Sequence, residues 1–284
     1  MPADVAIRPL RDEDVPAADA LATGLIGGAE PGETEAARRA RGLARIAHLA
    51  ETDPGGAWVA SRDGEVCGIA LALVREGIWG LSQFGVAEAA QGRGVGSALL
   101  ARTLAYGDGV RGRIILSSEH PAAIRLYART GIPVRPCLSA AGIVDQARIP
   151  DLAGVEEADA GGIAVADAIG REIRGAGHGR DLPVALRFGA RLFVVEDRAF
   201  CVLRGARAML LSGRDEAAAR TALWAAFAAA GPGATVGVDF LTAGQDWAVA
   251  VALDAGLGLS PDGPVFAGGQ LGPMAPYVPS GAYL

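Results

Sequence analysis

The sequence predicts a mixed α/β fold built from two similar halves. Short apolar segments with the composition of strands alternate with longer segments whose apolar residues recur at helical spacing. A glycine-rich stretch at residues 91–96 connects a strand to a helix. After residues 148–151 a similar order of elements begins again. We therefore expect two copies of one unit, each with a central sheet flanked by helices.

The first half is expected to alternate strands and helices. Asp63 and Gly64 form a hairpin signal between two of the strands, and Gly131 ends the last helix. Strands are expected at residues 5–8, 57–61, 66–74, 78–86 and 113–117, and helices from residue 11, over 33–50, after the glycine-rich stretch to residue 106, and over 121–130. Residues 134–144 indicate one or two further strands, interrupted near Ala141 and Gly142.

The second half is expected to repeat this order. Its predicted elements are a helix at 159–174, a three-stranded meander at 190–196, 199–203 and 208–212, a helix at 215–230, a strand at 234–241 and a helix at 245–255. The repeat predicts two domains, residues 1–147 and 148–284. Residues 174–181 are polar and rich in glycine, which indicates a solvated connecting loop. The alternative is a loop that brings Arg174 or His178 to a substrate.

Composition and charge exclude several classes of protein. The chain has 284 residues, of which 51% are hydrophobic and 20% charged, as in a folded protein. Its formal net charge of −6 argues against a nucleic-acid-binding surface, which is normally basic. The three cysteines are far apart and predict neither a metal site nor a disulfide framework. With no signal peptide and no apolar stretch long enough for a bilayer, we expect a cytoplasmic protein with no membrane partner.

The strongest chemical signal is the glycine-rich stretch. Three glycines allow several backbone N–H groups to turn toward one point without obstruction by a Cβ, and the following helix adds the positive end of its dipole. Such a turn can bind a phosphate or pyrophosphate. The alternative is a tight turn with no ligand. The stretch is neither a Walker loop nor a complete G-x-G-x-x-G fingerprint, since Ser97 stands where the last glycine would follow.

Two separated motifs resemble one enzyme family. Gln91, Gly94 and Gly96 fit the Q/R-x-x-G-x-G/A signature of the GCN5-related N-acetyltransferases (GNAT). Further along, residues 120–132 resemble the N-x-x-A-x-x-L-Y-x-x-x-G-F segment of the same family, with His120 in place of Asn and Ile132 in place of Phe. The resemblance covers residues 5–145. It implies a GNAT-like domain with a mixed, mainly antiparallel sheet, and acetyl-CoA as co-substrate.

The resemblance also implies which residues bind acetyl-CoA. Tyr127 stands where such enzymes often carry a general acid that protonates the thiolate leaving group; the alternative is a tyrosine that only packs. Arg93 either adds charge to the phosphates or is an ordinary exposed arginine. The implied cofactor-binding residues are Phe84, Gly85, Val86, Gln91, Gly92, Arg93, Gly94, Val95, Gly96, Ser97, His120, Ala123 and Tyr127.

The resemblance leaves the general base and the acceptor open. The strand at 78–84 lacks the glutamate that many relatives carry. The candidate bases are Glu76, Glu119 and the C-terminal carboxylate of Leu284, and none of them is singled out. The expected reaction transfers an acetyl group to a primary amine of a small molecule or a peptide. The alternative is a non-catalytic acyl-CoA-binding regulatory module. A nucleotide-binding oxidoreductase is disfavoured because no acidic residue follows the loop at the required distance. Whether the protein is a homodimer is left open.

In the second half, the strand at 235–241 and the helix at 245–256 resemble the closing strand and helix of the same family. No glycine-rich stretch precedes the helix at 215–230. We therefore expect a degenerate GNAT-like domain that does not bind CoA. Residues 272–284 combine apolar residues with prolines, which predicts an extended tail docked on the body of the protein, covering a cleft between the halves.

Overall fold

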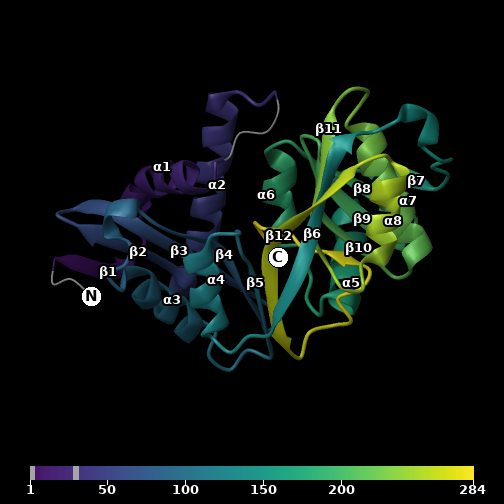
Figure 1. The fold of residues 1–284 in the computed structure, drawn as a ribbon. Coiled ribbons are helices and arrows are strands. Elements are labelled where there is room, and N and C mark those ends of the chain that lie inside the picture. The colour runs from purple at the N-terminus through teal and green to yellow at the C-terminus, as the bar shows by residue number, and fades with distance from the viewer. Residues whose placement is uncertain (1–3, 28–31) are drawn as a thin grey trace. The chain divides into compact units, whose positions relative to one another are not determined.

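The computed structural model describes residues 4–27 and 32–284. These residues fall into two compact units, Met1–Val110 and Arg111–Leu284, which are called unit 1 and unit 2 below. In Figure 1, unit 1 runs from purple to blue and unit 2 from teal to yellow. Both units are mixed α/β structures whose sheets are mainly antiparallel, as the sequence predicts.

Unit 1 contains an antiparallel sheet in the order β1-β2-β3-β4. Asp63 and Gly64 have φ angles of 52° and 86° and form the tight turn between β2 and β3. Helices α1 and α2 cover one face of this sheet and α3 covers the other (Figure 1). The strands are β1 (Val5–Pro9), β2 (Ala57–Arg62), β3 (Glu65–Arg75) and β4 (Ile78–Val86), and the helices are α1 (Val15–Ile26), α2 (Glu35–Thr52) and α3 (Val95–Tyr106).

Unit 2 contains a longer sheet in the order β5-β12-β6-β11-β10-β9-β8-β7, with β13 paired to β10. Helices α5 and α6 lie on one face, and α7 and α8 pack together on the other (Figure 1). The strands are β5 (Gly112–Leu116), β6 (Val134–Ile143), β7 (Val155–Ala158), β8 (Ala190–Val195), β9 (Ala199–Arg204), β10 (Arg207–Gly213), β11 (Thr235–Thr242), β12 (Gly258–Gly269) and β13 (Tyr277–Val278). The helices are α4 (Pro121–Ala128), α5 (Gly162–Ile173), α6 (Leu182–Arg187), α7 (Glu216–Ala229) and α8 (Asp246–Asp254).

The elements from β7 to β12 repeat the order of those from β1 to β6. In both runs a strand and two helices precede a three-stranded antiparallel meander, and a helix, a strand, a helix and a strand follow. The compact units divide at Val110 and Arg111, whereas the repeat divides after β6. The predicted domains, residues 1–147 and 148–284, follow the repeat and not the compact units. That these two ranges are separate domains stays a prediction.

The last strands of the two runs are exchanged. β12 lies between β5 and β6, and β6 lies between β12 and β11. The sequence did not indicate β12, because Pro261, Pro264 and four glycines argue against a central strand. A register shift between Asp262 and Val265 takes up Pro264, so that the strand pairs on both sides of this irregularity.

Two details of the sequence prediction were wrong. β6 is one continuous strand, since Ala141 and Gly142 pair with Gly237 and Val236 of β11. Residues 174–181 are not a solvated loop, because Arg174 is 1% exposed and His178 is fully buried. No helix in the described residues has the length and apolar character needed to cross a membrane.

Candidate functional site

The predicted cofactor-binding residues of unit 1 begin on a strand with a β-bulge. In the pairing of β3 with β4, Leu71 lies opposite Gln83 and Ala72 opposite Leu81, so Ser82 is the additional residue. Arg45 of α2 donates a hydrogen bond from Nη2 to the Ser82 carbonyl oxygen at 2.8 Å. A bulge bends a strand and redirects the residues after it, here Phe84 to Val86.

The connection from β4 to α3 is anchored by buried residues at both ends. The Ala87 N–H donates to the Cys67 carbonyl at 2.9 Å, and Ala90 and Val95 are each 1% exposed. The side chain of Gln91 donates from Nε2 to the carbonyl oxygen of Val86 at 2.9 Å, which ties the loop to the end of the strand. Between these anchors, residues 91–94 are exposed to solvent.

Glycine is required in this loop for its backbone conformation. Gly92 and Gly94 have φ angles of 71° and 83°, in the left-handed region that side chains disfavour. A Cβ at Gly92 would meet nothing within 4 Å, so the space in front of this residue is open. Gly94 is also the N-cap of α3 and provides no side-chain cap. The first N–H groups of α3 therefore have no capping side chain, and a glycine-rich, exposed helix start of this kind fits an anionic ligand.

The predicted residues of unit 1 thus lie on consecutive elements. Phe84, Gly85 and Val86 end β4, residues 91–94 form the exposed loop, and Val95, Gly96 and Ser97 begin α3. Arg93 is exposed in the same loop. One strand end, one loop and one helix start are therefore continuous in the structure, as the sequence order requires.

The remaining predicted residues belong to α4 in unit 2. His120 is exposed and is the N-cap of α4; its Nδ1 accepts a hydrogen bond from the Ala122 N–H at 3.3 Å. Accepting at Nδ1 places the ring proton on Nε2 in the neutral form, so the imidazole keeps one donor. Ala123 is half-buried in the first turn of the same helix.

Tyr127 is the most buried of the predicted residues in α4. It is 5% exposed, and its ring meets that of Phe266 edge-on at a centroid distance of 5.8 Å. Burial raises the pKa of the Tyr127 phenol well above its ordinary value, because the charged phenolate is poorly solvated there. The phenol therefore keeps its proton at neutral pH. Phe266 lies on β12, a strand that the sequence did not indicate.

No general base is evident among the candidates. Glu76 and Glu119 are both exposed, and the main-chain oxygen of Leu284 accepts a hydrogen bond from Arg174. In the part of the chain that the structure describes, no group of His, Cys, Asp and Glu side chains is arranged to bind a metal ion.

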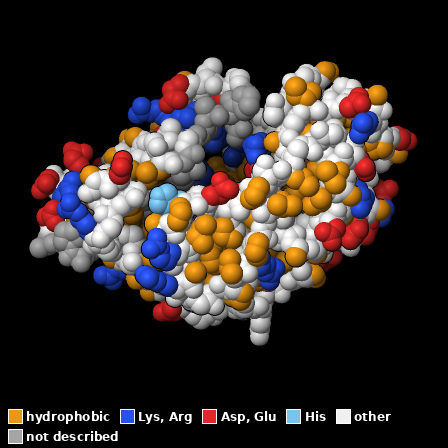
Figure 2. Space-filling model, in the orientation of Figure 1, with side chains coloured by type: hydrophobic (Ala, Val, Ile, Leu, Met, Phe, Trp, Pro, Cys, Tyr) orange, Lys and Arg blue, Asp and Glu red, His pale blue; other side chains and the backbone are white. Residues whose placement is uncertain are grey.

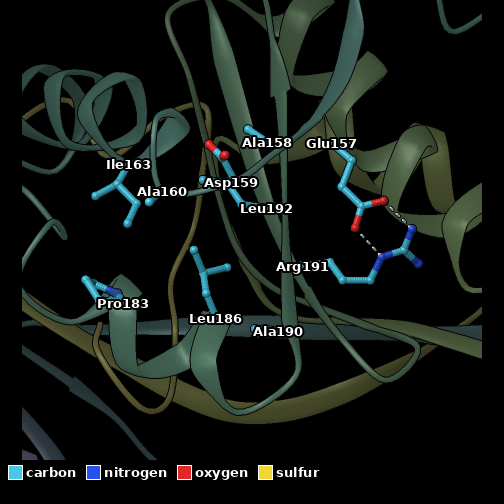
Figure 3. Close-up of a pocket in the computed structure, with 10 residues that line it drawn as sticks. All are labelled: Glu157, Ala158, Asp159, Ala160, Ile163, Pro183, Leu186, Ala190, Arg191 and Leu192. Carbon is cyan, nitrogen blue, oxygen red and sulfur yellow. Dashed lines mark hydrogen bonds and ion pairs between the residues drawn. The ribbon is translucent and has the colours of Figure 1, made fainter.

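A separate pocket of about 400 Å³ lies at the edge of unit 2 (Figure 3). Its walls come from β7, α5, α6 and β8, with Ile163, Leu186 and Leu192 among the apolar side chains. Glu157 and Arg191 at its rim form a two-point ion pair, with N–O distances of 2.8 and 2.6 Å. None of the predicted cofactor-binding residues lines it.

Exposed apolar side chains also occur on the strands of unit 2. Val134, Leu138 and Ile143 of β6 and Leu259 of β12 are each at least 37% exposed. Figure 2 shows hydrophobic side chains gathered in patches on the viewed face of the molecule, with arginine and acidic side chains between them. This face is mixed in charge, which agrees with the modest net charge of the chain.

The comparisons with known proteins agree with this description. Residues 27–132 match the family model described as the Acetyltransferase (GNAT) family. A candidate acetyltransferase of Pyrococcus horikoshii has a TM-score of 0.79 at 17% identity, covering 100% of this chain and 97% of that one. GCN5-related N-acetyltransferases of Sphaerobacter thermophilus and Kribbella flavida have TM-scores of 0.59 and 0.56 at 15% and 16% identity, covering 95% and 92% of this chain and 96% and 70% of theirs. A search of curated proteins found no significant match.

These findings define first a fold and then a family. The structural neighbours show that the chain has the GNAT fold, which confirms the predicted fold class. The family model then identifies a GNAT acetyltransferase domain at residues 27–132, which confirms the resemblance drawn from the two motifs. The match ends at residue 132, before the second repeat begins.

Proposed function

We propose that the protein is an N-acetyltransferase that transfers the acetyl group of acetyl-CoA to a primary amine of a small molecule or a peptide. The observation that carries this proposal is the exposed turn at residues 91–94, which leads into an α3 N-terminus without a side-chain cap. Backbone N–H groups at such a helix start bind phosphates. The family match over residues 27–132 supports acetyl-CoA as the bound molecule.

The proposed binding residues follow from the family resemblance and the local geometry. The N–H groups of residues 92–97 bind the pyrophosphate, and Arg93 adds a positive charge at the exposed loop. The ends of β4 at Gly85 and Val86 bond the amides of pantetheine. The Val86 carbonyl already accepts one bond from Gln91 and has a second lone pair for this purpose. His120 keeps an Nε2–H donor for the cofactor.

The proposed reaction is direct attack of the amine nitrogen on the thioester carbonyl. A C–N bond forms, the C–S bond breaks, and the thiolate leaving group takes a proton from the Tyr127 hydroxyl. The amine loses a proton to solvent or to a base that the structure does not single out. The role of Tyr127 rests on the resemblance. Its phenol, whose pKa is raised by burial, is protonated at neutral pH as an ordinary tyrosine is.

The binding proposal is tested with two matched glycine variants. Gly92→Ala and Gly64→Ala both place a Cβ at a positive φ where nothing lies within 4 Å, so both cost about 1 kcal/mol of stability. Only Gly92→Ala should weaken acetyl-CoA binding, by about tenfold, because it disturbs N–H groups that face the pyrophosphate. Isothermal titration calorimetry measures the affinities and thermal unfolding measures the stabilities.

Two results would contradict the proposal. If the wild-type protein binds no acetyl-CoA at high micromolar concentration, acetyl-CoA is not its cofactor. If Gly92→Ala and Gly64→Ala lose equal affinity for acetyl-CoA, the loop at residues 91–94 is not the binding site. An acceptor screen that detects free CoA thiol then separates the enzyme from a non-catalytic acyl-CoA-binding module. The absence of an evident base makes this second candidate worth the assay.

A further inference from the structure

The C-terminal segment, residues 272–284, is built into unit 2. Nine of its residues, including Tyr277, Val278 and Tyr283, are buried. Its short strand β13 pairs antiparallel with the second half of β10, where Tyr277 lies opposite Ser212 and Val278 opposite Leu211. The Gly213 N–H also donates to the Pro276 carbonyl at 3.2 Å. The segment therefore adds a short strand to the sheet.

This added strand occupies the place where β10 and β11 separate. The two strands are paired in parallel only at Arg207 with Gly237 and at Ala208 with Val238. Beyond that point β10 continues beside β13, while β11 continues beside β6. β13 also contacts β11. The chain thus fills with its own backbone the opening between two diverging strands.

A buried glutamine holds the segment by its main chain. Gln245 is 1% exposed and donates from Nε2 to the Met274 carbonyl at 2.8 Å. Its Oε1 accepts the Tyr277 N–H at 3.0 Å. At the other end of the segment the buried Arg174 donates to the main-chain oxygens of Tyr283, at 3.0 Å, and Leu284. Main-chain recognition of this kind, with buried apolar side chains, is how proteins bind extended peptides.

The elements around the segment correspond to those proposed to bind acetyl-CoA in the first repeat. β10 precedes α7 as β4 precedes α3. Gln245 is the N-cap of α8 as His120 is the N-cap of α4, and Gly256 follows Gln245 at the spacing at which Gly131 follows His120. This correspondence with a cofactor position rests on the proposed function.

Other positions of the second repeat are unsuited to acetyl-CoA. The N-cap of α7 is Asp215, whose Oδ1 accepts the Ala218 N–H at 2.9 Å, whereas the N-cap of α3 is Gly94. A carboxylate at this helix start satisfies an N–H group that a phosphate would need and repels the phosphate charge. Ala252 stands at the spacing from Gln245 at which Tyr127 follows His120.

We propose that residues 272–284 are a built-in peptide ligand of the second repeat, bound in the opening between β10 and β11 that corresponds to the acetyl-CoA position of the first repeat. The segment completes the sheet and keeps this repeat closed to the cofactor. Because it is covalently attached, its effective concentration at the opening is high, and a free cofactor competes poorly with it.

The test cleaves the connection without deleting any residue. A protease recognition sequence is inserted after the exposed Gln270, and the folded full chain is cut there. The released fragment, residues 271–284, should stay with the protein through gel filtration and exchange slowly with a labelled synthetic copy. A fragment that separates from a chain whose circular dichroism and melting temperature are unchanged would overturn the proposal.

Variants on both sides of the contact sharpen the test. Gln245→Ala should speed the exchange about tenfold, because it removes two bonds to the segment's main chain, while Gln146→Ala at an exposed position should change nothing. A synthetic peptide N-methylated at Tyr277 lacks the N–H that Gln245 accepts but keeps the buried ring, so it should bind the unaltered cleaved protein about tenfold more weakly. Equal exchange for the two glutamine variants and equal affinity of the two peptides would overturn the binding mode.

Acetyl-CoA distinguishes this inference from the proposed function. One equivalent should bind to the intact protein, and millimolar acetyl-CoA should not release the cleaved fragment. Release of the fragment, or binding of two equivalents, would overturn the closure of the second repeat. An intact protein that binds none would overturn the proposed function, and the exchange assay would still decide whether the segment is a bound ligand.

Discussion

At the scale of single residues, burial decides what the tyrosines of unit 2 can do. Tyr127 packs edge-on against Phe266, and burial raises the pKa of its phenol. Burial likewise raises the pKa of Tyr277 to about 12. Both phenols are protonated at neutral pH, but only Tyr127 is proposed as the general acid. A buried, protonated phenol is therefore proposed to act in the reaction at Tyr127, whereas at Tyr277 it packs within the fold.

Replacing Tyr127 by phenylalanine tests the proposed acid. Tyr127→Phe removes the hydroxyl and keeps the ring, so kcat should fall about a hundredfold while the affinity for acetyl-CoA stays the same. Tyr106→Phe, which removes a hydroxyl bonded to Asp53 at 3.0 Å, is the matched control and should keep its rate. Steady-state kinetics and calorimetry make the comparison. An unchanged kcat would assign Tyr127 to packing against Phe266.

The raised pKa of Tyr127 gives this prediction a pH dependence. A folded-state pKa above the ordinary value of about 10 means that the protonated acid persists to higher pH than in a free tyrosine. The wild-type rate should therefore show no loss from tyrosine ionisation between pH 7 and about pH 10. A decline in kcat centred below pH 10 that Tyr127→Phe abolishes would show that the phenol ionises earlier than its burial implies.

At the scale of elements, the start of a helix has opposite designs in the two repeats. α3 begins at Gly94, which leaves its first N–H groups uncapped, whereas α7 begins at Asp215, which caps its own helix and pairs with Arg198. The main-chain N–H of Ala218 is the largest cause that lowers the pKa of the Asp215 carboxyl, and Arg198 adds to it. The start of α3 is thus available to an external anion, whereas the start of α7 is already capped by the Asp215 carboxylate.

The substitution Asp215→Ala tests how much the Asp215 cap of α7 contributes to stability. Loss of the cap should cost unit 2 about 1 kcal/mol at pH 7. Because the folded-state pKa is lowered, this contribution is present above the carboxyl's ordinary pKa of 3.8 and is lost as pH falls through the folded value. The cost of the substitution should therefore shrink toward pH 3.

Thr34→Ala is the control, because it removes the uncharged cap of α2. Urea unfolding should show the same loss of stability for this variant at pH 7 and at pH 3. A pH-independent cost at Asp215 would contradict the charge argument.

At the scale of the whole molecule, the exchanged strands β6 and β12 join the two repeats. β12 pairs with β5, which belongs to the first repeat, and β6 pairs with β11, which belongs to the second. Neither repeat can complete its sheet without a strand from the other. Strands paired on both sides in this way link the stability of β5 to that of β11.

Phe266→Ala tests this link. Phe266 is fully buried on β12, so its truncation should destabilise unit 2 by about 3–5 kcal/mol. Leu259→Ala on the same strand removes a side chain that is 37% exposed and should cost less than about 1 kcal/mol. Hydrogen exchange should show β5 and β11 losing protection together in Phe266→Ala. Loss of protection in β5 alone would show that the repeats unfold separately.

The sequence by itself determined the local features of this protein. Residues 91–96 predict a turn and a helix start because glycines at 92 and 94 can adopt positive φ angles without steric cost. The strands of both meanders were recognised because alternating apolar runs between tight turns depend on near neighbours in the sequence. The two GNAT motifs are likewise local, and the family model confirms them over residues 27–132.

Only the tertiary structure decided which segments complete the sheets. β12 has prolines and glycines that argue against a strand, and it pairs because β5 and β6 both present unsatisfied edges to it. For the same reason β13 pairs with β10. Arg174 and His178 are buried because residues 272–284 supply their partners, which are main-chain oxygens for Arg174 and the Tyr277 hydroxyl for His178. Pairing between residues far apart in the chain leaves no periodic signal in either segment, so the fold alone determines it.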